Sequence, residues 1–336
     1  MSVGKEAKSR FRLLLCRRHA YMTRRMRSGI FISETWDEAS SIDELRSRAR
    51  SAETLGIEHG WVPSLPWSLD ALASVQAAGE VTTSLGLGTA VIPTYFAHPL
   101  ALARQAATTQ AAVGRPVVLG IGCSNQFVVE MHGLAYERPA AHVRDYLEVL
   151  NAAAKSTDGQ VSFNGELYRV DGMYATPGAE ACPVLVGALG PRLLRAAGAL
   201  SDGTIATWSN ARAIETAVRP DLEAAAKEAG RAAPRVGAVV PFLVTGDIDA
   251  GRALAAEKFA VFDSLPRYKR MVELGGASSA ADICIVGDKR ALRDALAEFR
   301  DAGLTDFLGA PLCMGERDVS WQRCAEALAW ARSELG

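Results

Sequence analysis

The sequence lacks an excess of charge of either sign, any closely spaced pair of cysteines and any long apolar run. Of its 336 residues, 37 are Lys or Arg and 38 are Asp or Glu, which gives a formal net charge of -1. This balance argues against a nucleic acid or a membrane surface as the main partner, so we expect a small-molecule substrate. No apolar run approaches the length that spans a bilayer.

The cysteines and one missing turn exclude further classes of protein. The cysteines are Cys16, Cys123, Cys182, Cys284, Cys313 and Cys324, with no Cys-x-x-Cys spacing among them. We therefore expect free thiols in a reducing cytoplasm, without a disulfide framework or a metal site. A Rossmann fold would place a glycine-rich turn after its first strand, and residues 33–41 contain no glycine.

The first 28 residues differ from the rest of the chain because they are rich in Lys and Arg. Their apolar run at 13–15 is too short for the core of a secretory signal, and no small-residue cleavage site follows it. We expect residues 1–28 to be a basic, disordered extension, with Met22 or Met26 as a candidate natural start. Residues 29–336 are expected to form a single domain.

From Gly29 onward, strand-like and helix-like segments alternate, which is the pattern of a parallel sheet wrapped by helices. Expected strands begin at residues 29, 59, 85, 116, 183, 203, 236 and 305. The fourth strand is expected to end at residue 119. Pro99, Pro139 and Pro191 each begin an expected helix, and Ser41 and Glu44 form an expected capping box at the start of another. A long alanine-rich helix is expected after the sixth strand, to about residue 230. Eight strand and helix pairs predict an α/β fold of the (β/α)8 TIM-barrel type. Insertions are expected after the fourth strand, as a hairpin at 161–173, and after the seventh, at 249–285.

Three loops follow strands at the carboxyl end, where TIM barrels place their active sites. They are residues 89–99, 120–126 and 187–192. Glycine in these loops lets the backbone approach a ligand, and a helix that begins after Gly190 offers free amides for a phosphate. Arg192 either contacts that phosphate or faces solvent. His98 either belongs to the site or caps the helix that Pro99 begins.

Together with several other segments, these loops resemble the luciferase-like monooxygenase superfamily, and within it the branch of oxidoreductases that use the deazaflavin coenzyme F420. The segments that carry the resemblance are 49–62, 87–99, 114–124, 136–139, 189–192 and 199–203. The resemblance implies a luciferase-like TIM barrel, and it implies a homodimer, because relatives are commonly dimers.

The resemblance also assigns residues to the cofactor. A bulge after the third strand, often with a cis bond between non-proline residues, presses on the back of the flavin or deazaflavin ring, and Ala90-Val91 matches that bulge. The residues implied to bind the cofactor are Thr89, Ala90, Val91, Gly122, Ser124, Gly187, Leu189, Gly190, Pro191, Arg192 and Trp208. Trp208 either walls the pocket or is a buried core residue.

The implied reaction is hydride transfer between the deazaflavin and a small organic substrate. Candidate catalytic residues are Glu34 and His98 for moving a proton and Asn125 for a hydrogen bond, although a solvated carboxylate is the alternative for Glu34. An FMN-dependent monooxygenase fed by a separate reductase stays open as a second interpretation. A catalytically silent flavin-binding relative is the third, since Ala97 and Asn125 stand where an arginine and a histidine are common.

Overall fold

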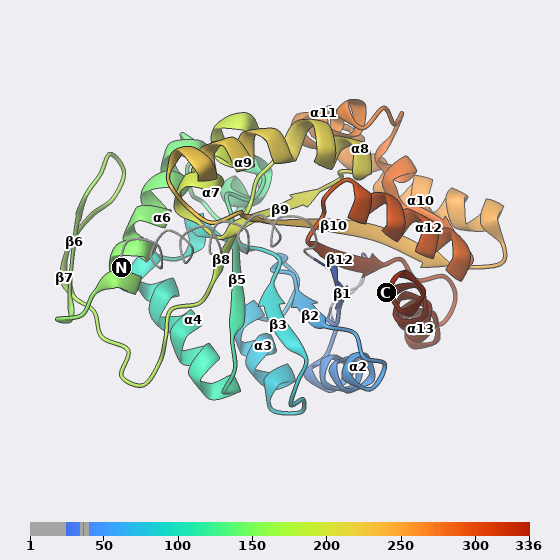
Figure 1. The fold of residues 1–336 in the computed structure, drawn as a ribbon, viewed down its shortest axis with the longest axis horizontal. Helices are drawn as coiled ribbons and strands as arrows, with labels where there is room; N and C mark the ends of the chain where they lie inside the picture. Colours follow the sequence, from blue (N-terminus) through green and yellow to red (C-terminus); the bar gives the residue numbers. More distant parts are fainter. Residues whose placement is uncertain (1–24, 34–35, 37–39) are drawn as a thin grey trace, which may run out of the picture.

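The computed structural model describes residues 25–33, 36 and 40–336. Eight of its strands form the barrel: β1 (Arg27–Phe31), β2 (His59–Val62), β3 (Gly86–Thr89), β5 (Val117–Gly122), β8 (Val184–Gly187), β9 (Gly203–Thr207), β10 (Arg235–Val244) and β12 (Asp306–Pro311). Each pairs in parallel with the next in this order, and β12 pairs with β1 to close the ring (Figure 1). The predicted TIM barrel is confirmed.

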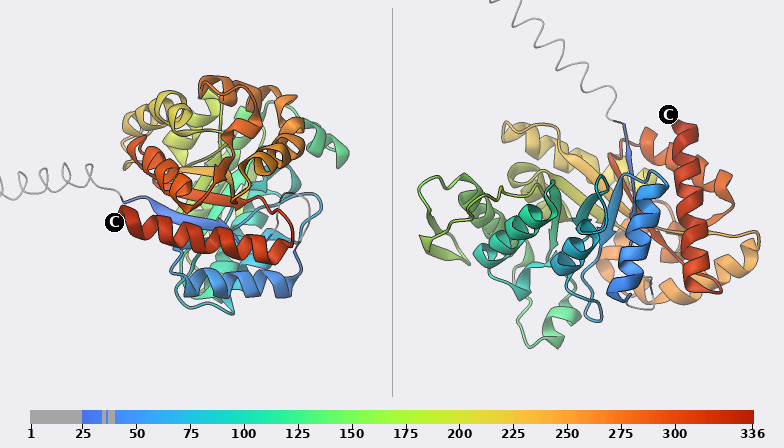
Figure 2. Two further views of the ribbon diagram at one scale, coloured as in Figure 1. Left: turned by 90° about the vertical axis from the view of Figure 1, so that its right-hand side faces the viewer. Right: turned by 90° about the horizontal axis from the view of Figure 1, so that it is seen from below.

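Helices surround the barrel. They are α2 (Ile42–Thr54), α3 (Ala71–Gly79), α4 (Pro99–Val113), α6 (Pro139–Lys155), α7 (Pro191–Leu200), α9 (Arg219–Glu228), α12 (Lys289–Asp301) and α13 (Arg317–Leu335). Figure 2 shows α13 beside α2, and Arg48 and Asp318 join these two helices by an ion pair of 2.8 Å. None of the helices in the described part of the chain is long and apolar enough to cross a membrane.

Local side chains determine several helix ends. The capping box at the start of α2 is present, because the Ser41 side chain accepts from the Glu44 amide at 3.3 Å and the Glu44 carboxylate accepts from the Ser41 amide at 2.7 Å. Proline occupies the first turn of α4, α6 and α7, as predicted. Asp288 caps α12 by accepting from two backbone amides at 2.9 Å.

The predicted insertions are present. The strands β6 (Gln160–Asn164) and β7 (Arg169–Met173) form the hairpin, which projects from the edge of the molecule (Figure 1). The second insertion contains α10 (Ile248–Asp263), α11 (Pro266–Leu274) and the 3-10 turn η3 (Ala280–Ile283), and it ends in β11 (Ile285–Gly287) beside β10. Shorter elements are β4 (Ile92–Pro93), η1 (Thr94–Phe96), α5 (Gln126–Met131), α8 (Ala211–Ala213) and the π-helix η2 (Ile214–Val218).

Some predicted boundaries were wrong. The expected fourth strand ended at residue 119, with the following glycines in a loop, whereas β5 continues to Gly122. Gly120 pairs with Leu185 and Gly122 with Gly187. Because these two positions of β5 carry no side chain, the strand fits beneath the loop that follows β3. The alanine-rich helix expected to end near residue 230 is interrupted by η2. The first strand begins at Arg27, two residues before the expected start.

The middle of the barrel holds a cluster of buried apolar side chains around one large ring, that of Trp61, with glycines in the neighbouring strands. Trp61 is 1% exposed and points inward from β2. A Cβ atom at Gly29 would lie 2.4 Å from the Trp61 indole nitrogen, and one at Gly88 would lie 2.6 Å from its ring. Glycine in the two neighbouring strands is therefore required for Trp61 to fit.

The amino-terminal end of the barrel is closed by a charged layer. The carboxylate of Asp306 is paired with Arg27 at 2.8 Å and with Arg235 at 2.6 Å. Burial by itself raises the pKa of Asp306, but hydrogen bonding and charge from Arg235 reverse this and lower it to about 2. Burial lowers the pKa of the adjacent His59 to about 4, so its imidazole is neutral at pH 7.

Candidate active site

Backbone irregularities gather at the carboxyl end of the barrel. The peptide bond between Ala90 and Val91, directly after β3, is cis. Among the described residues other than glycine, a positive φ occurs at Ser124 (59°) and Trp208 (55°), which lie just after β5 and β9, and at Arg138 (49°). Positive φ is uncommon for residues with a side chain, and such residues cluster at functional sites. We therefore place the candidate site at this end.

Val91, which follows β3, lies against the ends of β5 and β8. Val91 is partly exposed and packs on the apolar cluster inside the barrel. A Cβ atom at Gly122 would lie 2.8 Å from Cγ2 of Val91, and one at Gly187 would lie 3.3 Å from the same atom. The buried Thr89 hydroxyl donates to the Gly120 carbonyl and accepts from the Gly120 amide, both at 2.9 Å. We expected these glycines to admit a ligand, and the structure shows that they also make room for Val91.

A polar cluster that the sequence did not reveal joins the loop after β5 to the second insertion. The Tyr136 hydroxyl lies 3.3 Å from Cys123 Sγ and 3.2 Å from the Ser124 carbonyl oxygen. Arg267, from α11, donates through Nη1 to the Tyr136 hydroxyl at 2.5 Å and to Cys123 Sγ at 3.4 Å. Burial raises the pKa of Tyr136, so its phenol is neutral. Segment 136–139 carried part of the family resemblance, but neither Tyr136 nor Arg267 was among the predicted site residues.

Two predicted site residues meet at Tyr268 of the same insertion. Asn125 donates through Nδ2 to the Tyr268 hydroxyl at 3.3 Å, and the Tyr268 and Trp208 rings lie 6.2 Å apart. Trp208 is 1% exposed and packs on Phe259 at 5.0 Å and Phe262 at 4.4 Å between ring centres. Trp208 is thus in a buried aromatic cluster, and the second insertion covers this part of the barrel's carboxyl end.

The N-terminus of α7 offers one free backbone amide to an anionic group. Gly190 is the N-cap, Pro191 has no amide hydrogen, and the Leu193 amide donates to the Gly190 carbonyl at 3.0 Å, so within the described residues only the Arg192 amide of this turn has no partner. A Cβ atom at Gly190 would meet no atom within 4 Å, which leaves open space beside the N-cap. Pro191 and Arg192 are exposed, and no carboxylate within the described residues pairs with Arg192. Leu189, just before Gly190, is partly buried.

Of the two residues predicted to transfer a proton, Glu34 and His98, the structure describes one. Glu34 lies outside the described residues. His98 is exposed and is the N-cap of α4, where its Nδ1 accepts from the Leu100 amide at 3.3 Å. Its ring also lies 5.7 Å from that of Tyr168 in the hairpin. The capping role is therefore real, and the catalytic role of His98 stays a prediction.

A buried histidine that we did not single out supports the end of β5. Nε2 of His142 lies 3.0 Å from the Thr94 hydroxyl, and that hydroxyl donates to the Gly122 carbonyl at 3.2 Å. Because the only hydroxyl hydrogen is used, the His142 Nε2 must be the donor to Thr94. Burial lowers the pKa of His142, which agrees with a neutral ring stacked on Tyr95 at 3.9 Å. This chain of bonds ties α6 to the candidate site.

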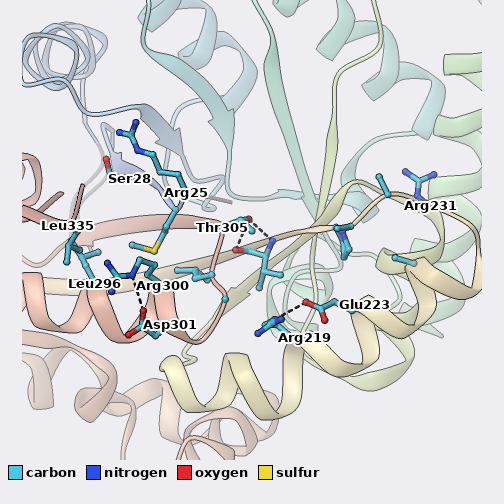
Figure 3. A pocket seen from close by; sticks show the side chains of 18 of the residues that line it. Arg25, Ser28, Arg219, Glu223, Arg231, Leu296, Arg300, Asp301, Thr305 and Leu335 are labelled. Atoms are coloured by element: carbon cyan, nitrogen blue, oxygen red, sulfur yellow. Dashed lines mark hydrogen bonds and ion pairs between the residues drawn. The ribbon is translucent and has the colours of Figure 1, made fainter. Parts of the chain in front are cut away.

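The opposite end of the barrel holds a cavity of about 900 Å³, shown in Figure 3. Its cations include Arg25, Arg219 and Arg300, which already have carboxylate partners: Arg25 pairs with Glu58 at 3.5 Å, Arg219 with Glu223 at 2.8 Å and Arg300 with Asp301 at 2.9 Å. This cavity adjoins the amino-terminal ends of β1, β10 and β12, so it is separate from the candidate site. No group of three or more metal-ligating side chains occurs among the residues that the structure describes.

Comparison with known proteins identifies relatives over most of the barrel. The family model for luciferase-like monooxygenases matches residues 26–306. A 5,10-methylenetetrahydromethanopterin reductase of Archaeoglobus fulgidus is 25% identical over 65% of this chain, and an F420-dependent glucose-6-phosphate dehydrogenase of Nakamurella multipartita is 32% identical over 62%. These alignments span 65% and 61% of the relatives' own lengths.

Solved structures share the fold. An F420-dependent secondary alcohol dehydrogenase, in complex with an F420-acetone adduct, superposes with a TM-score of 0.75 at 18% identity, covering 90% of this chain and 98% of that one. An EDTA monooxygenase from a Chelativorans species superposes with a TM-score of 0.74 at 15% identity, covering 93% and 94%. The match of the family model over most of the barrel shows that this chain belongs to the luciferase-like monooxygenase family.

Proposed function

We propose that this chain transfers a hydride between coenzyme F420 and a small organic substrate at the carboxyl end of the barrel. The observation that carries the proposal is the similarity to relatives whose names state F420 dependence, such as the glucose-6-phosphate dehydrogenase of Nakamurella multipartita. The position of Val91 supports it, because this residue packs on the apolar cluster inside the barrel and follows Ala90 where the resemblance to this family implies a bulge against the cofactor ring. A cytoplasmic location and a homodimer stay predictions.

In this proposal, the loops after three strands hold the cofactor. The backbone amide and the guanidinium of Arg192, at the start of α7, would bind its phosphate, because neither has a hydrogen-bond partner among the described residues. Val91, Gly122 and Ser124 would hold its ring. When bound, the deazaflavin would supply a two-electron hydride donor or acceptor.

For the substrate, the chain would supply orientation and a proton. Asn125 is held by Tyr268 and orients the substrate through a hydrogen bond. His98 uses Nδ1 as the acceptor in its cap, so its Nε2 carries the hydrogen in the neutral tautomer. Glu34 follows β1 in the sequence, and it is the second candidate for holding the proton.

Spectroscopy of the purified protein tests the proposal. We expect oxidised F420 to bind, with a change in its absorbance or fluorescence, and reduced F420 to be retained without oxygen uptake. The same titrations with FMN and reduced FMN are the control. Binding of FMN alone, followed by oxygen consumption from the reduced form, would contradict the proposal.

An FMN-dependent two-component monooxygenase is the second candidate function. It is favoured by the description of the family itself and by the fold shared with the EDTA monooxygenase. The phosphate-binding residues would be the same in both cases, and oxygen uptake separates them. If the protein binds neither cofactor, the third interpretation, a catalytically silent relative, would be favoured instead.

A further inference from the structure

One cation beside the candidate site has no carboxylate partner in the part of the chain that the structure describes. Arg267 is an exposed residue at the second position of α11, and no described carboxylate pairs with it. Its Nη1 makes both of its hydrogen bonds, to Tyr136 and Cys123, so the Nε–H and Nη2–H groups keep their donor capacity. Many other arginines of the described chain are ion-paired, including Arg48 and Arg235. Arg267 is therefore a charged donor that has no counter-ion within residues 25–33, 36 and 40–336.

The position of this guanidinium is fixed. Its central carbon lies 5.3 Å from the centre of the Tyr136 ring, within the range of a cation–π contact. Burial acts to lower the pKa of Arg267, but Cys123 and Tyr136 outweigh it and raise the pKa, so the side chain stays charged. An arginine held in this way loses little further freedom when an anion binds.

The surroundings place Arg267 near the residue that is proposed to orient the substrate. Its hydrogen-bond partner Cys123 directly follows β5. The next residue of α11, Tyr268, is the partner of Asn125, which the proposed function assigns to the substrate. No acidic residue occupies the first turn of α11, so its amides add a favourable field for an anion instead of opposing one.

We propose that Arg267 determines specificity by binding an anionic oxygen group of the substrate, a carboxylate or a phosphate. The proposal rests on the proposed function, because that function places the substrate at this end of the barrel. The planar guanidinium suits both groups, since its two unused donor groups match a pair of oxygens. The phosphate of the cofactor is assigned to α7, which leaves Arg267 for the substrate.

Binding of simple anions tests this role without knowledge of the natural substrate. To separate this site from the phosphate site proposed at α7, inorganic phosphate and, separately, succinate are titrated by calorimetry into the Gly190→Leu protein as well as the wild type, without cofactor and at low ionic strength. Arg267→Gln removes the positive charge and the paired N–H donors of the guanidinium, whereas Arg267→Lys keeps the charge alone. Arg270→Gln is the matched control, because it removes an exposed charge from the same helix. Circular dichroism and the Tm confirm that each variant is folded.

We expect Arg267→Gln to weaken anion binding by about 10 to 100-fold, the loss typical of a charge-assisted hydrogen bond. Arg267→Lys should fall between Gln and the wild type, and Arg270→Gln should change the affinity by less than about twofold because its charge is solvated. The affinity for F420, measured by fluorescence, should be unchanged in Arg267→Gln.

Three results would overturn the proposal: neither anion binds the wild type, both Gln variants weaken binding equally, or Arg267→Gln weakens F420 binding by a similar factor. The last would assign Arg267 to the acidic part of the cofactor. If the wild-type protein does not bind F420, that result would instead contradict the proposed function. The anion titrations would still report on Arg267, so the two failures can be told apart.

Discussion

The contact between Gly122 and Val91 predicts a specific weakness beneath the candidate site. A Cβ atom added at Gly122 would lie 2.8 Å from Val91 Cγ2, whereas ordinary contacts begin near 3.4 Å, so the two atoms must separate by about 0.6 Å. Overpacking of this kind costs about 1 to 3 kcal/mol. A domain of about 300 residues shifts its Tm by about 1.6 °C per kcal/mol, so we expect Gly122→Ala to lower the Tm by roughly 2 to 5 °C. The shift of Val91 should also weaken cofactor binding.

A double-mutant cycle measures this contact directly. Val91→Ala removes the methyl group that the new Cβ atom meets, so the double variant should recover most of the stability lost in Gly122→Ala. The expected coupling is about 0.5 to 3 kcal/mol, obtained from chemical denaturation of the four proteins. Gly187→Ala is the matched control, because its Cβ atom would lie at 3.3 Å and should cost less. Costs that add within about 0.5 kcal/mol would refute the reasoning.

Two further predictions follow from the two ends of the barrel. The folded state holds His59 neutral with a pKa of about 4, below the usual 6.5, so protonation favours the unfolded chain and stability should fall from pH 6.5 down to about 4. A His59→Gln variant should show a flatter Tm profile over this window, and an unchanged profile would contradict the burial argument. At the other end, Gly190→Leu should leave the Tm unchanged, because no atom lies within 4 Å of the added Cβ, while F420 affinity falls sharply. Unchanged F420 affinity would contradict the assignment of the phosphate site to the start of α7.

Much of the fold could be predicted because its signals are local. Proline at the start of α4, α6 and α7 fixes the backbone for a first helical turn, and a serine three residues before Glu44 completes a capping box. The errors fell where tertiary contacts override local preference. Glycines at the end of β5 favour a loop by themselves, but they lie in a strand because Thr89 and Val91 pack where their side chains would be.

The candidate site divides in the same way. The bulge at Ala90–Val91 and the start of α7 each lie on a continuous segment of sequence, so a short motif is enough to indicate them. Arg267 belongs to an insertion more than a hundred residues from Cys123, and no spacing in the sequence connects the two. The role of His142 was hidden for the same reason, because its partner Thr94 lies on another element.

The sequence by itself determined the alternation of strands and helices, the helix ends and the order of the loops, since each depends on residues that are neighbours along the chain. The tertiary structure alone decided which side chains share the mouth of the barrel and which cations find a counter-ion. Those properties depend on distances between segments that only barrel closure brings together. The same closure pairs the charge of Arg235 with Asp306 at one end and leaves that of Arg267 without a described carboxylate at the other.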